Sequence, residues 1–72
     1  MTTEEALIEI SRERKNKEQI GATRQELMRK TGLSLRETLA DLREMIDAGV
    51  VQCHPTINSV FYSFTNKAYY AQ

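Results

Sequence analysis

The only cysteine and the only histidine of the chain are adjacent, at Cys53 and His54. A thiolate beside an imidazole could act as a nucleophile with its base, or supply two metal ligands. A zinc site needs about four ligands, however, and adjacent residues on a strand point to opposite faces. We therefore expect Cys53 to be a small buried apolar residue. We expect no enzyme activity, cofactor, metal ion or small-molecule substrate.

Length and composition favour one small globular domain spanning residues 1–72. The chain is 40% hydrophobic and 28% charged, which is typical of globular domains. No apolar run approaches the roughly 20 residues needed to cross a bilayer. The N-terminus is acidic and polar, unlike a secretory leader, and a single cysteine fits a reducing compartment. We therefore expect a cytoplasmic protein with no membrane association.

The net charge is zero, but the basic residues are concentrated between residues 12 and 30. This segment carries seven lysines and arginines against three acidic residues. Such an excess could form a modest positive face. Considered alone, the charges fit an ordinary solvated surface better.

Three helices are predicted, at residues 3–16, 23–31 and 34–48. In the first, Ala6, Leu7, Ile10 and Arg14 fall on one stripe at helical spacing. Between the first two helices, residues 19–22 are too short for a helix and are expected to be extended, with a one-bridge strand as the form considered.

Capping signals define the second and third helices. Thr23 and Glu26 have the spacing of a capping box, and so do Ser34 and Glu37. Gly32, between the two boxes, is expected to end the second helix. These signals predict two helices joined by a tight turn.

A β-hairpin is predicted at residues 50–64, with strands at 50–54 and 60–64. Pro55 is expected to end strand pairing and to begin a loop over residues 55–59. Val60, Tyr62 and Phe64 would share one face of the second strand. Residues 65–72 form a short tail. The chain is thus predicted to be α+β, with three helices and a two-stranded hairpin.

From residue 22 to residue 65, this order of elements resembles a winged helix-turn-helix domain of the small bacterial, phage and plasmid regulator type. The resemblance is carried by four stretches: Thr23–Leu27, Gly32–Ser34, Leu42–Val51 and Tyr62–Thr65. It implies a transcriptional regulator that binds double-stranded DNA. The helix beginning near Ser34 would enter the major groove, and the hairpin, or wing, would touch the backbone or the minor groove.

Nine residues are expected to contact DNA on this resemblance. They are Thr23, Arg24, Ser34, Leu35, Arg36, Leu39, Arg43, Asn58 and Ser59. Arg36 would read guanine, and Arg43 would contact phosphate. Alternatively, Arg36 pairs with Glu37 or Asp41, and Arg43 pairs with Asp47. Thr23 and Ser34 would cap their helices and also contact phosphate.

Alignment to the resemblance turns Thr38, Leu42 and Met45 inward, and it leaves Leu35 and Leu39 on or near the groove-facing side. Two leucines there could contact thymine methyl groups or form a protein interface. If the helix is rotated, both are core residues, which is the explanation we favour.

A second function class therefore stays open: a winged-helix module that binds another protein and not DNA. The neutral charge supports it, as do Asp41 and Glu44, which would repel phosphate if they faced a duplex. A homodimer built by exposed Phe61, Tyr69 and Tyr70 is a further possibility.

Overall fold

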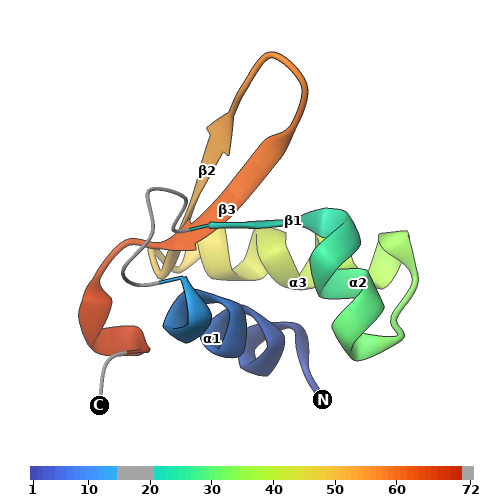
Figure 1. Cartoon of the computed structure of the whole chain (residues 1–72), viewed down its shortest axis with the longest axis horizontal. Helices are drawn as coiled ribbons and strands as arrows, with labels where there is room; N and C mark the ends of the chain where they lie inside the picture. Colours follow the sequence, from blue (N-terminus) through green and yellow to red (C-terminus); the bar gives the residue numbers. More distant parts are fainter. Residues whose placement is uncertain (15–20, 71–72) are drawn as a thin grey trace.

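The computed structural model describes residues 1–14 and 21–70. This part of the chain has three α-helices and a three-stranded antiparallel sheet with strand order β1-β3-β2. In chain order the elements are α1 (Thr3–Glu13), β1 (Ala22–Thr23), α2 (Arg24–Thr31), α3 (Leu35–Asp47), β2 (Val51–Pro55), β3 (Val60–Phe64) and the 3₁₀ turn η1 (Lys67–Tyr69). The helices lie together, and the β2–β3 hairpin rises away from them (Figure 1). The fold class is α+β.

Helix α1 begins with a capping box that the sequence analysis did not single out. The Thr2 hydroxyl accepts from the Glu5 amide, and the Glu5 carboxylate accepts from the Thr2 amide. The predicted stripe is confirmed, because Ala6, Leu7 and Ile10 are buried. The helix ends at Glu13, short of the predicted residue 16; residues 15 and 16 lie outside the described part.

Helix α2 forms as its capping signals predict. The Thr23 hydroxyl accepts from the Glu26 amide, and the Glu26 carboxylate accepts from the Thr23 amide, so both halves of the box are present. Gly32 ends the helix in the left-handed conformation with φ 76°. A side chain with a Cβ is disfavoured there, which explains the glycine.

Helix α3 is capped by Ser34, whose hydroxyl accepts from the Glu37 amide at 3.2 Å. The second capping box was also predicted to have the Glu37 carboxylate accept from the Ser34 amide, and that part of the prediction is wrong. The Glu37 carboxylate accepts from the Ser34 hydroxyl at 3.3 Å instead of from the Ser34 amide. Spacing alone predicted the cap correctly but not the rotamer of the glutamate.

The sheet has three strands and not the predicted two, because β1 pairs with β3. Ala22 and Thr23 pair with Tyr62 and Phe61 of β3, so the extended piece expected at 19–22 is found at 22–23. Residues 19 and 20 lie outside the described part. A Cβ on Gly21 would lie 3.0 Å from the Tyr62 carbonyl oxygen, so glycine permits this close approach. Two residues are too few to produce a recognisable alternation of polar and apolar side chains.

The hairpin loop is shorter than predicted. Pro55 pairs with Val60 as the last residue of β2, whereas the sequence analysis placed it in the loop. Because β2 is an edge strand, the missing proline N–H can face outward without breaking the ladder. Strand β3 has its predicted limits.

The core lies between the helices and the sheet. Its apolar members are Ala6, Leu7, Ile10, Ala22, Leu27, Leu42, Val51, Tyr62, Phe64 and Tyr70. Cys53 is exposed, so its predicted burial is wrong. It stands opposite Tyr62 in the register, two residues beyond buried Val51. The outer part of the hairpin projects away from the helices (Figure 1), and the residues of β2 after Val51 are exposed.

The C-terminal turn folds back onto α1. Tyr70 is buried, its ring lies 5.9 Å from that of Phe64, and its carbonyl accepts from Arg12 Nε at 2.9 Å. Its expected exposure at a dimer interface is therefore wrong. Tyr69 remains exposed and stacks on Phe64 at 5.7 Å, and Phe61 is half-buried.

Candidate nucleic-acid interface

Helix α3 packs on the core along one side. Thr38 and Leu42 are buried and Met45 is half-buried, which confirms the three residues expected to turn inward. Because an α-helix repeats every 3.6 residues, the remaining positions of α3 form separate stripes on its outer surface. The chemistry of these stripes decides what the helix can bind.

One outer stripe is basic. Arg36 and Arg43 are exposed and seven residues apart, which places them on the same side of the helix. Within residues 1–14 and 21–70, neither arginine forms an ion pair, so the alternative partners Glu37, Asp41 and Asp47 are not used. Both guanidinium groups are therefore available to a ligand from outside the described chain.

A second stripe is acidic and lies on another side of α3. Glu37, Asp41 and Glu44 follow one another at spacings of four and three residues. Asp41 accepts a hydrogen bond from the Thr3 hydroxyl at 2.7 Å, and Glu44 lines a shallow cleft with Thr3. Asp41 and Glu44 thus lie beside the start of α1, whereas Glu37 is exposed next to Ser34 and Asp47 is exposed one turn after Arg43.

A third stripe is apolar and partly exposed. Leu35 is 48% exposed, so its favoured assignment to the core is wrong, whereas Leu39 is half-buried. Ile46, which the sequence analysis did not single out as a surface residue, is 38% exposed and continues the stripe. Leu35 is the first residue of α3, where there is no preceding turn of helix to cover it.

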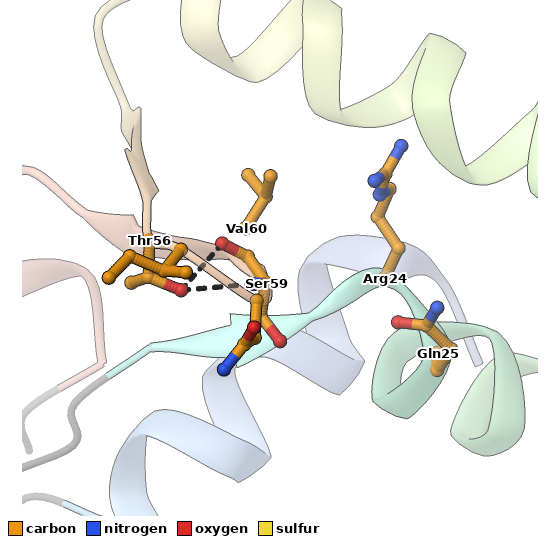
Figure 2. Close-up of a pocket in the computed structure, with 7 residues that line it drawn as sticks. Arg24, Gln25, Thr56, Ser59 and Val60 are labelled. Atoms are coloured by element: carbon orange, nitrogen blue, oxygen red, sulfur yellow. Dashed lines mark hydrogen bonds between the residues drawn. The ribbon is translucent and has the colours of Figure 1, made fainter.

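A polar cleft of about 290 Å³ separates the start of α2 from the hairpin turn. It brings together residues that the sequence analysis named from two segments: Arg24 at the start of α2, and Asn58 with Ser59 in the hairpin turn. Figure 2 shows the Arg24 side chain leaving the start of α2 on the side where Val60 also projects. Gln25, Thr56, Ile57 and Val60 complete the lining but were not predicted, because only the fold places the turn opposite α2.

The hairpin turn is held by its own hydrogen bonds (Figure 2). The Thr56 hydroxyl donates to the Ser59 carbonyl at 2.8 Å and accepts from the Ser59 amide at 3.0 Å. The Thr56 amide also donates to the Ser59 carbonyl, at 2.7 Å. The turn therefore presents its side chains from a fixed backbone, and Ile57 at the tip is fully exposed.

The start of α2 is held to the end of α1. Arg14 forms an ion pair with Glu26 and donates to the Gly21 carbonyl at 2.7 Å. Burial would raise the pKa of Glu26, but hydrogen bonds from Arg14 and Thr23 outweigh it and lower that pKa. The Thr23 hydroxyl already accepts the capping hydrogen bond from the Glu26 amide, so a bound phosphate would have to share this hydroxyl.

The basic segment at residues 12–30 does not form one continuous positive face. Arg12 and Arg14 donate to groups within the domain, and Lys30 lies 3.8 Å from Glu13. Lys15 and Lys17 lie outside the described residues. Among the described basic residues of this segment, Arg12, Arg14 and Lys30 are thus engaged by groups of the domain, whereas Arg24 and Arg29 form no ion pair.

His54 Nε2 lies 2.9 Å from the Ser63 hydroxyl. Among residues 1–14 and 21–70, no group of three or more His, Cys, Asp or Glu side chains is placed to hold a metal ion. In the same part of the chain, no helix has the length and apolar character needed to cross a membrane.

Comparisons with family models, curated proteins and solved structures gave no match to this chain. Geometry and charge therefore carry the functional proposal.

Proposed function

We propose that this chain is a small winged helix-turn-helix regulator that binds double-stranded DNA through α3. Three helices and a β1-β3-β2 sheet are compatible with that fold. The observation that carries the proposal is the separation of charge on α3. Arg36 and Arg43 are exposed on one side, whereas Asp41 and Glu44 lie beside the start of α1.

This separation matters because both walls of the major groove are lined with phosphates. Duplex DNA carries about one negative charge per 1.7 Å of its axis, so an acidic outer face would repel it. Arg36 lies in the first turn of α3, the part of a recognition helix that faces base edges, and can bind guanine O6 and N7. Arg43 lies about two turns later and would contact phosphate.

The polar cleft gives the DNA backbone a second contact. Arg24 lies at the first position of α2, where free backbone amides and the helix dipole favour an anion. Asn58 and Ser59 face it from the hairpin turn. A phosphate entering between them would be contacted by both segments while α3 occupies the groove.

A titration of a labelled duplex at about 50 mM and about 200 mM salt tests the proposal. Each phosphate contact adds about −0.9 to the slope of log affinity against log salt concentration. We expect Arg36→Ala to weaken binding about tenfold or more, since a good bidentate pair contributes about 1–3 kcal/mol.

Arg29→Ala is the matched control, because Arg29 is an exposed arginine that lines a cleft with residues of α1, away from the basic stripe. It should bind DNA as the unaltered protein does. Absence of duplex binding at the lower salt concentration would refute DNA recognition.

A second candidate function is recognition of another protein through α3. It is favoured by the exposure of Leu35 and Ile46 and by the zero net charge. Apolar contacts with a protein would depend little on salt, whereas phosphate contacts weaken steeply. The same titration therefore separates the two functions.

A further inference from the structure

We propose that Leu35 and Leu39 contact thymine methyl groups, so that the preferred target contains thymine beside the guanine bound by Arg36. The inference rests on the proposed DNA binding and deepens it by naming the base composition that α3 selects. The apolar stripe on α3, formed by Leu35, Leu39 and Ile46, is only partly covered by the core.

Leu35 occupies a position where a polar residue would be expected if the surface only met water. It directly follows the cap Ser34 and is 48% exposed, although the helix buries Thr38 and Leu42 nearby. Leu39 lies one turn later on the same side and is half-buried. The stripe therefore presents a leucine edge at the end of α3 that would face the bases.

The charges beside this stripe favour DNA as its occupant. Arg36 adjoins Leu35 in the first turn, and Arg43 follows Leu39 by one turn. The acidic residue Asp41 is held on another side by Thr3. An apolar strip bordered by cations complements a groove in which base methyl groups lie between two rows of phosphates.

Base chemistry then defines the target class. Thymine alone among the four DNA bases carries a methyl group in the major groove, and guanine offers two acceptors to an arginine. Leu35 and Arg36 are consecutive residues in one turn of α3, so they would reach neighbouring base pairs. Steps that combine thymine and guanine satisfy both side chains.

Two duplexes that differ only in the thymine methyl group test this inference. One pairs an alternating thymidine–guanosine strand with its complement; the other replaces every thymidine with deoxyuridine, which keeps all base pairs. We expect about fourfold tighter binding of the thymidine duplex for each methyl group contacted, the equivalent of about 0.8 kcal/mol per buried carbon group.

Leu35→Ala combined with Leu39→Ala should abolish the preference for the thymidine duplex while retaining salt-dependent binding. Leu35→Met, which keeps an apolar side chain, should retain the preference. Circular dichroism checks that the helices persist in each variant, and Leu35→Ala alone serves if the double variant unfolds.

Equal, salt-dependent binding of both duplexes by the unaltered protein would overturn this inference and leave DNA binding intact. A methyl preference that survives in a folded Leu35→Ala variant would also overturn the assignment to Leu35. If neither duplex binds, both proposals are overturned. If the protein self-associates and Leu35→Ala abolishes that association, the stripe is a protein interface.

Discussion

Arg14 and Glu26 form an ion pair that joins the end of α1 to the first turn of α2. One Arg14 nitrogen donates to Glu26 Oε1 at 3.0 Å and also to the Gly21 carbonyl, while the other pairs with Glu26 Oε2. Glu26 also closes the capping box with Thr23. A single carboxylate therefore fixes both the start of α2 and its position against α1.

Arg14→Ala should lower the free energy of unfolding by about 1 kcal/mol. The pair is half-buried, so the loss lies between that of an exposed ion pair and that of a buried charged hydrogen bond. Urea unfolding followed by circular dichroism measures it. Arg29→Ala, which removes an arginine that forms no ion pair within the described residues, should leave stability nearly unchanged; an equal loss would contradict the role given to Arg14.

Stability should fall in acid in a way that depends on Glu26. Its pKa in the folded protein is lowered, so the stabilisation is present above the unfolded value, near about 4.3, and is lost as the pH falls through the folded value. The difference in unfolding free energy between the unaltered protein and Glu26→Gln should be constant from about pH 6 to 7.

Below about pH 4 that difference should shrink. Glu5 also has a lowered pKa, because of hydrogen bonds involving Thr2, so Glu26→Gln is expected to keep some acid sensitivity. A difference in unfolding free energy that grows as the pH falls would contradict the lowered pKa of Glu26.

Thr38→Val should stabilise the domain by about 1 kcal/mol. The Thr38 hydroxyl is buried and has no hydrogen-bond partner among the described residues, and an unsatisfied buried group of this kind is costly. Valine has nearly the same shape. Thermal unfolding measures the effect, with Thr23→Val as the contrast: its hydroxyl caps α2, so that variant should lose about 1 kcal/mol.

Arg24→Ala should weaken binding to every duplex by a similar factor. A residue that contacts phosphate carries no base information, so its loss reduces the salt slope by about 1 without altering sequence preference. Arg36→Ala should instead weaken binding most for duplexes that contain guanine at the contacted position. Competition between labelled duplexes separates the two patterns, and a sequence-selective effect of Arg24→Ala would argue against its phosphate role.

Tyr70→Ala should destabilise the domain by about 2 kcal/mol, because it removes a buried ring that packs on Phe64. Tyr69→Ala makes a matched comparison, since Tyr69 also lies against Phe64 but is exposed. It should cost clearly less. Equal losses in urea unfolding would mean that burial of Tyr70 is not what secures the C-terminal turn.

The limits of the helices were predictable because their signals are local. Thr23, Glu26 and Gly32 set the limits of α2 through contacts within one turn, whereas the inward side of α3 followed from the family resemblance and not from spacing alone. Strand β1 was harder to predict, since two residues become a strand only when β3, far along the chain, lies beside them. Pro55 was misassigned because its place on an edge strand depends on strand order.

For the candidate site, the sequence supplied residue types but not their grouping. It named Arg24 apart from Asn58 and Ser59, and only the fold places all three around one cleft. It could not decide whether Leu35 was buried, because one residue of α3 can turn either way until the neighbouring helices are packed. The hydrogen bond that holds Asp41 on the α1 side joins residues 38 positions apart, which no local pattern reports.

The hydrogen bond from Arg12 to the Tyr70 carbonyl fastens the last described residue to the first helix. The start of α1 and the turn η1 both lie at the end of the molecule opposite the hairpin tip (Figure 1). The hairpin tip therefore projects from the side of the domain that lies away from both of these segments (Figure 1).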